Sequence, residues 1–154
     1  MICKRGKNPD VQIMARVPTP EEMNGYNEGG LPHILGIKIV ETAAGRIVGH
    51  LPVKPELVAR NGALWAPAIV ALADTLCAYG VWTVAPEGPT GFTTIELKCN
   101  FMSTITAGAA KCVAQVLHAG RQTQVWDATV TSEETGKLMA TFRNTQMLLW
   151  PRAK

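Results

Sequence analysis

A single acidic residue, Asp74, stands inside an otherwise uncharged stretch of twenty residues that runs from Ala63 to Trp82 (ALWAPAIVALADTLCAYGVW). A carboxylate in apolar surroundings is costly, and aspartate is too short to reach solvent from a buried backbone. If the stretch is helical, the side chains three and four residues away are all small or apolar, namely Val70, Ala71, Cys77 and Ala78. Such neighbours raise the pKa of a carboxyl group and make it a stronger base once ionised.

Two interpretations of Asp74 are open at this point. In the first, the carboxylate activates water or attacks a carbonyl carbon, and unpaired N–H groups at the helix N-terminus stabilise the resulting oxyanion. Ala66 carries such an N–H group, whereas Pro67 has none. In the second, Asp74 is a structural residue whose carboxylate is satisfied by Thr75, Tyr79 or a backbone group.

The stretch must be positioned by the rest of the chain, and its composition predicts a buried helix. Its length approaches that of a membrane span, but Asp74 lies near its middle and Pro67 interrupts its start. A helix that is apolar on all sides can also form the core of a soluble protein. We therefore predict no membrane span.

The surrounding segments alternate with the period of strands. Residues 36–53 predict a hairpin that turns near Ala44 and Gly45, and residues 93–101 alternate strictly. Three more strands follow, linked by tight turns at 119–121 and 132–136. The residues expected on one face of the 93–101 strand are Thr93, Ile95, Leu97, Cys99 and Phe101. The order of two strands, one long helix and four strands predicts an α+β fold in which an antiparallel sheet wraps around the helix.

The N-terminal segment is predicted to be separate from this unit. Residues 1–30 are expected to be partly disordered, with poor order over 1–18 and a short helix that begins at Thr19 (TPEEM). Residues 31–150 are expected to form one domain, because the chain shows no internal repeat or second composition.

With these elements in place, the chain resembles the hotdog-fold acyl-CoA thioesterases of the phenylacetate-degradation (PaaI-like) type. The resemblance covers about residues 31–149 and rests on NGALWAPAIVALADTLCAYG, TTIELKCNFM and HAGRQTQVWDATVTSEETGKLMATFRNTQML. It implies a hotdog fold, hydrolysis of a small-molecule acyl-CoA, and a homodimer or homotetramer with sites at the dimer interface. No cofactor is implied, since coenzyme A belongs to the substrate.

The resemblance also assigns roles to individual residues. Asp74 matches the family's catalytic acid, and Thr94 matches a polar residue that assists in some members. The family's His-Gly-Gly motif is replaced by Trp65, Ala66 and Pro67, and Ala59 stands where an asparagine usually precedes it, with Asn61 two positions away. Ala66 retains the N–H of the first glycine, so it remains the expected oxyanion donor. Trp65 either donates from its indole or plugs the pocket, and the plug is favoured.

Outside the motif, Arg121 suits a phosphate of coenzyme A, because arginine binds phosphates with two parallel hydrogen bonds. The expected substrate-binding residues are therefore Trp65, Asn61 and Arg121, and the expected catalytic residues are Asp74, Ala66 and Thr94. The lost motif keeps a second function open, namely a hotdog protein that binds acyl-CoA or a related ligand without hydrolysing it. A hydratase is less favoured, since no histidine lies near Asp74 in the sequence.

The composition also indicates which partners and which cellular location to expect. The 154 residues are 47% hydrophobic and 18% charged, with a net charge of +3. The only basic cluster is at residues 4–7, so no nucleic-acid partner is expected. The four cysteines and three histidines show no zinc spacing, so no metal is expected. Unpaired cysteines and the lack of a signal sequence predict a cytoplasmic protein.

Overall fold

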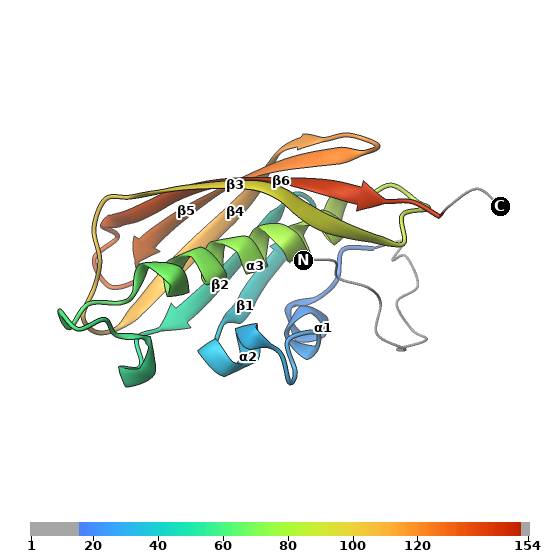
Figure 1. Ribbon diagram of the computed structural model, residues 1–154. Helices are drawn as coiled ribbons and strands as arrows, with labels where there is room; N and C mark the ends of the chain where they lie inside the picture. Colours follow the sequence, from blue (N-terminus) through green and yellow to red (C-terminus); the bar gives the residue numbers. More distant parts are fainter. Residues whose placement is uncertain (1–15, 152–154) are drawn as a thin grey trace.

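Six antiparallel strands in the described part of the chain, residues 16–151 of the computed structural model, form a sheet that curves around one long helix (Figure 1). The strands lie in the order β1-β2-β4-β5-β6-β3. The predicted chain order of two strands, one helix and four strands is confirmed. The elements are α1 (Pro20–Gly25), α2 (Leu31–Leu35), β1 (Lys38–Ala43), β2 (Arg46–Pro52), the 3-10 helix η1 (Pro55–Leu57), α3 (Ala66–Val84), β3 (Gly91–Phe101), β4 (Ala109–Ala119), β5 (Thr123–Ser132) and β6 (Leu138–Leu149).

Helix α3 supplies much of the hydrophobic core. It is long and apolar enough to cross a membrane by length and composition, but half of its most apolar window is buried inside the fold. Its buried residues meet the concave face of the sheet, where the indole of Trp126 is fully buried. A Cβ at Gly80 would lie 2.6 Å from the Trp126 ring, so glycine allows the helix to approach this indole closely. The long apolar segment is therefore the core helix that the sequence predicts.

Strand β3 departs from the strict alternation that its sequence predicts. Its pairing with β6 contains a bulge between Thr94 and Glu96, which leaves Ile95 as the extra residue. The bulge shifts the alternation by one position, so Thr94 and Leu97, whose partners Gln146 and Asn144 are buried, share the concave face. The predicted face of Thr93, Ile95, Leu97, Cys99 and Phe101 is therefore wrong for its first two members. A bulge cannot be recognised from alternation that continues unbroken through it.

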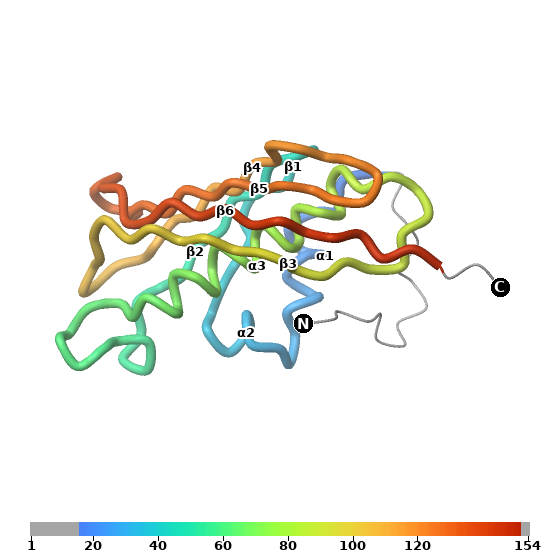
Figure 2. Tube along the Cα trace, turned by 45° about the horizontal axis from the view of Figure 1, so that its top comes forward, coloured from blue at the N-terminus to red at the C-terminus, as the bar shows by residue number. Residues whose placement is uncertain are grey.

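The two edges of the sheet differ in how their backbone is protected. On β1, the amide of Asn24 donates to the carbonyl oxygen of Ile39 at 2.8 Å and accepts from its N–H at 2.9 Å. Helix α1 thereby occupies part of this edge. Strand β3 forms the opposite edge, with β6 beside it along its length and no further strand on its outer side in residues 16–151 (Figure 2). An unprotected edge of this kind is a template for pairing with another chain.

The N-terminal helices lie on the β1 side of the fold, where α1 contacts β1 (Figure 1). Thr19 caps α1 in a capping box with Glu22, as TPEEM predicts. Helix α2 was not expected; it ends at Gly36, whose φ of 81° is the left-handed conformation that glycine adopts readily. The carbonyl oxygen of Pro18 accepts a hydrogen bond from the Thr42 hydroxyl. The poor order predicted over residues 1–18 stays a prediction, and residues 1–15 lie outside the described residues.

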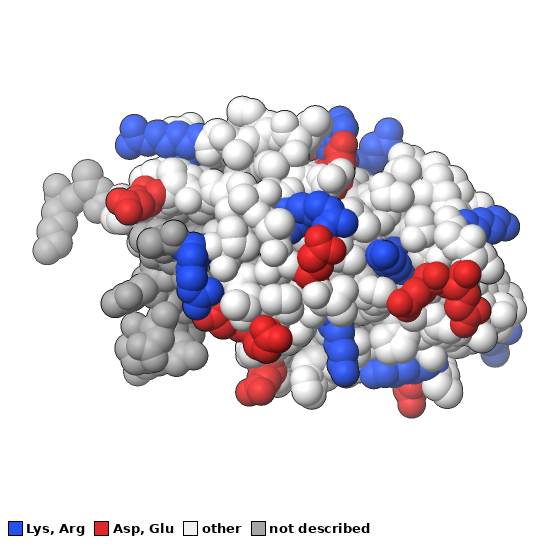
Figure 3. Space-filling model, turned by 180° about the vertical axis from the view of Figure 1, so that it is seen from behind, with Lys and Arg blue, Asp and Glu red and all other residues white. Residues whose placement is uncertain are grey.

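Charge is distributed without a large area of one sign on the face opposite to that of Figure 1. Figure 3 shows basic and acidic side chains close to one another and separated by wide uncharged areas. On the sheet, Arg143 donates two hydrogen bonds to the carboxylate of Asp127, at 2.5 and 2.7 Å. This face therefore has the mixed charge of an ordinary solvated surface.

Candidate active site

Asp74 lies in the third turn of α3 and is held by β6. Its Oδ1 accepts a 3.0 Å hydrogen bond from Nδ2 of Asn144, and no other group in residues 16–151 donates to the carboxylate. Burial raises the pKa of Asp74, and the bond from Asn144 opposes that rise. The hydroxyl of Tyr79 donates to Asn27 instead. The side chain that bonds to Asp74 is therefore Asn144, and not Thr75 or Tyr79, the two side chains expected for a structural Asp74.

Buried amides continue from Asn144 along the concave face of the sheet. We call Gln124, Asn144 and Gln146 the amide row; all three side chains are fully buried. The Thr94 hydroxyl donates to Oε1 of Gln146 at 3.1 Å, which places this predicted catalytic residue on the same row. In the described part of the chain, Oδ1 of Asn144 and Nε2 of Gln146 have no hydrogen-bond partner. Thr94 thus bonds to Gln146, which neighbours Asn144 on the buried face of β6, and Asn144 in turn bonds to Asp74.

The N-terminus of α3 is the second part of the candidate site. Trp65 is the N-cap residue, with the extended angles φ −70° and ψ 135°, and its side chain makes no capping bond. The carbonyl oxygen of Trp65 accepts from Ala68 at 2.9 Å, whereas no acceptor for the N–H of Ala66 is seen within residues 16–151. Pro67 fits because the second helical position needs no N–H group. Ala66 therefore presents one free donor at the positive end of the helix.

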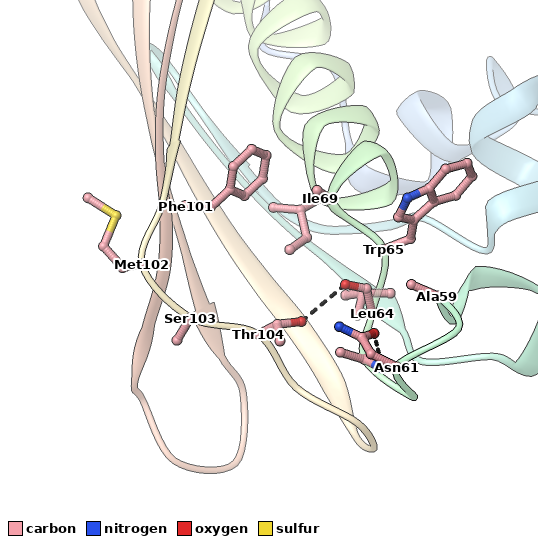
Figure 4. Close-up of a pocket in the computed structure, with 11 residues that line it drawn as sticks. Ala59, Asn61, Leu64, Trp65, Ile69, Phe101, Met102, Ser103 and Thr104 are labelled. Atoms are coloured by element: carbon pink, nitrogen blue, oxygen red, sulfur yellow. Dashed lines mark hydrogen bonds between the residues drawn. The ribbon is translucent and has the colours of Figure 1, made fainter.

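A cavity of about 380 Å³ opens at this N-terminus. Figure 4 shows that Phe101 and Ile69 point toward one another across it, while the indole of Trp65 lies on the other side of the helix start. Trp65 is 58% exposed, so it lies at the rim instead of filling the cavity. Asn61 also lines the cavity, but its Oδ1 accepts from the N–H of Ala63. The favoured interpretation of Trp65 as a plug is not supported by this position in a single chain.

Asp74 and the N–H group of Ala66, the predicted base and oxyanion donor, do not meet within one chain. Asp74 follows Ala66 by eight positions on α3, which corresponds to about 12 Å along the axis. Asp74 accordingly does not line the cavity that Ala66 lines. A thioester carbonyl would have to lie within about 3 Å of each group. One copy of the chain therefore does not bring the two predicted groups to one carbonyl.

Arg121 is placed far from both groups. It lies in the turn between β4 and β5, where its guanidinium carbon is 5.0 Å from the centre of the Trp150 ring. The α3 N-terminus is bonded to the loop before β4, since Leu64 donates to Ile105. The eleven residues of β4 span about 35 Å between that loop and Arg121. Arg121 cannot contact a ligand at Ala66 of its own chain unless the ligand is of similar length.

The other reactive side chains are poorly suited to chemistry. Cys77, Cys99 and Cys112 are free, as predicted, and burial raises the pKa of each thiol. Cys77 follows Asp74 by one turn, but a buried thiol with a raised pKa is a poor nucleophile. Residues 16–151 contain no group of three His, Cys, Asp or Glu side chains placed to hold a metal ion.

Sequence reasoning missed Asn144, the one side chain within residues 16–151 that bonds to Asp74. The signal was present in β6, where Phe142, Asn144, Gln146 and Leu148 alternate onto the buried face. Two amides between two large apolar residues on a buried face need partners. The sequence could show that need, but not that the partner of Asn144 is seventy residues away on α3.

Comparison with known proteins places this geometry in context. Residues 61–139 match the family model described as "Thioesterase superfamily". The chain is 30% identical over 116 residues to 1,4-dihydroxy-2-naphthoyl-CoA hydrolase of Listeria monocytogenes, covering 75% of this chain and 93% of that one. It is 30% identical over 121 residues to the proofreading thioesterase EntH of Klebsiella pneumoniae, covering 79% and 87%.

Solved structures share the fold. A mutant of the thioesterase PA1618 from Pseudomonas aeruginosa superposes with a TM-score of 0.83 at 23% identity, over 91% of this chain and all of that one. The PaaI protein of E. coli superposes with a TM-score of 0.73 at 24% identity, over 82% and 88%. These neighbours confirm the predicted hotdog fold.

Proposed function

Because the chain belongs to the thioesterase superfamily, we propose that it is an acyl-CoA thioesterase in which Asp74 acts as general base or nucleophile. The observation that carries the proposal is the state of this carboxylate. One oxygen is held by Asn144, the other has no hydrogen-bond donor within residues 16–151, and burial raises the pKa of the group. A coenzyme A thioester as the substrate is supported by the Listeria relative, whose name is that of a CoA-ester hydrolase.

The reaction needs a donor for the oxygen that becomes negative, and the free N–H of Ala66 is the proposed donor. Thr94 is proposed to assist from the amide row, and Trp65 and Asn61 to line the acyl end of the site. Arg121 is proposed to bind a phosphate of coenzyme A. The hydrolysis requires no cofactor, since coenzyme A enters as part of the substrate, and the proposed location is the cytoplasm.

The 12 Å between Ala66 and Asp74 is the reason to propose a homo-oligomer. In a symmetric dimer, Asp74 of one copy faces the Trp65–Pro67 turn of the other, and each interface forms two sites. The edge strand β3 suits such pairing because it is unprotected and carries exposed apolar side chains. These are Ile95, Leu97, Phe101 and the adjoining Met102, each about half exposed.

The test is a panel of acyl-CoA esters, with thiol release followed spectroscopically for the native protein and for Asp74→Asn. Asp127→Asn is the matched control, because it makes the same change at a carboxylate on the opposite face of the sheet. We expect turnover of at least one ester by the native protein and by the control, and none above background by Asp74→Asn. Binding of acyl-CoA without any turnover would instead establish the alternative, a non-catalytic ligand-binding protein.

A further inference from the structure

We propose that Asn144 is a positioning residue, which holds Oδ1 of Asp74 so that Oδ2 is presented to the substrate. The inference rests on the proposed function, since it concerns how the proposed base is oriented. Asn144 does not touch substrate in this scheme. It acts only through Asp74, by the single 3.0 Å hydrogen bond from its Nδ2.

The backbone of Asn144 is fixed on both sides. Strand β6 lies between β5 and β3, and Asn144 pairs with Trp126 on one side and with Leu97 on the other. Its side chain is fully buried, so few rotamers are available to it. A donor on such a strand restrains the carboxylate of a residue on a separate element, α3. This arrangement fixes the rotation of Asp74 more firmly than a neighbour on the same helix could.

The energetic cost of burying the Asn144 amide also indicates a specific role for this residue. Oδ1 of Asn144 is buried without a partner in the described part of the chain, and an unsatisfied buried oxygen is destabilising. The flanking residues of this face, Phe142 and Leu148, are apolar and buried. A leucine at position 144 would continue that apolar face without the unsatisfied oxygen. Within residues 16–151, the bond to Asp74 is the one hydrogen bond that the Asn144 side chain makes.

This bond also affects protonation of the base. Burial raises the pKa of Asp74, and the hydrogen bond from Asn144 is the main effect within residues 16–151 that lowers it again. Within residues 16–151, no titratable side chain bonds to Asp74. The carboxylate is one of the effects that raise the pKa of Cys77, but burial is the largest of them and keeps this thiol neutral. Loss of the donor should therefore leave Asp74 protonated at a higher pH.

The experiment compares the pH dependence of kcat for the native protein, Asn144→Leu and Asn144→Val. Both variants remove the N–H donor and add no titratable group, so both should move the acid limb to higher pH. On the acid side of that limb, kcat of Asn144→Leu should be about tenfold below the native value, the factor that one charge-assisted hydrogen bond represents. KM should change little. Asn144→Val carries a smaller, β-branched side chain that suits a strand and serves if the leucine variant does not fold.

Gln124→Leu is the matched control, because Gln124 is an equally buried amide of the same row that does not bond to Asp74. Its acid limb should stay at the native pH. NMR titration of the Asp74 carboxyl carbon follows the same shift without any substrate. If the native protein hydrolyses no ester, the proposed function fails, while this titration still decides the bond. An unmoved limb and an unmoved carboxyl titration in both Asn144 variants would overturn the inference.

Discussion

Asp74→Asn separates catalysis from packing, because it removes the base and keeps the shape of the side chain. Asn144 can donate to the amide oxygen at position 74 as it does to the carboxylate, so the buried contact survives. A positioned general base contributes about 10²–10⁴-fold to a rate. We therefore expect kcat, measured by thiol release, to fall at least about a hundredfold on every ester that the native protein hydrolyses.

The stability of this variant can be worked out from the same bond. A hydrogen bond to a charged group stabilises a fold by about 1.5–3 kcal/mol and one between neutral groups by about 0.5–1.5 kcal/mol, so the variant gives up about 1 kcal/mol at Asn144. It also removes the burial of a charge, which is the effect that raises the pKa of Asp74. We expect the two to offset, which keeps Tm at pH 7 within about 4 °C of the native value.

The pH dependence of stability gives a sharper comparison. Because the folded-state pKa of Asp74 is raised, the folded chain binds more protons at this carboxyl than the unfolded chain does. The stabilisation from this group is complete below the unfolded pKa and is lost as the pH rises through the folded pKa. Asp74→Asn does not titrate, so its Tm relative to native should rise from acid to neutral pH. An unchanged rate, or a relative Tm that falls over this range, would show that Asp74 is a structural carboxylate.

Three further predictions concern the donor, the edge strand and the core. Restoring His-Gly-Gly at residues 65–67 should raise kcat by up to about two to three orders of magnitude. The two glycines should lower the free energy of unfolding by at most about 2 kcal/mol. An unchanged rate in kinetic assays would show that these residues do not limit catalysis. Ile95→Glu places a charge on the exposed edge and should yield monomers in sedimentation velocity, where the native chain should be oligomeric. Equal sedimentation would exclude this part of β3 from the interface. Gly80→Ala should lower Tm by several degrees in thermal melts, because the added Cβ would lie 2.6 Å from the Trp126 ring. A higher Tm would mean that the greater helix propensity of alanine outweighs this clash.

Local signals in the sequence were sufficient for most of the fold. Gly45 marks the β1–β2 turn with a φ of 72°, and Gly136 marks the β5–β6 turn with a φ of 69°. Proline and the run of alanines set the start and type of α3. These features depend on residues close together in the chain, so they can be recognised without the tertiary structure. Helix α2 escaped prediction because five residues are too few to establish a periodic pattern.

The candidate site was predictable only in part, because its geometry depends on residues distant in sequence. Asp74 could be recognised from its apolar neighbours, since these lie on the same helix. Asn144 could not be assigned as its partner, because the contact depends on how α3 lies across β6. The bulge at Ile95, which puts Thr94 on the face of the amide row, also depends on pairing with β6. Tertiary packing decides the partner of Asp74 and the position of the bulge, and no local sequence pattern indicates either.

The separation between Ala66 and Asp74 links the tests of activity and of association. The rise of a helix fixes their distance at about 12 Å in any chain that keeps α3 intact, so the distance does not depend on how the sheet curves. Catalysis by both groups on one carbonyl therefore requires two copies. If this is correct, Ile95→Glu should lose activity in proportion to its loss of association, although Ile95 contributes no chemistry. A fully active monomer would mean that Asp74 works without the Ala66 donor, and another group would then have to stabilise the oxyanion.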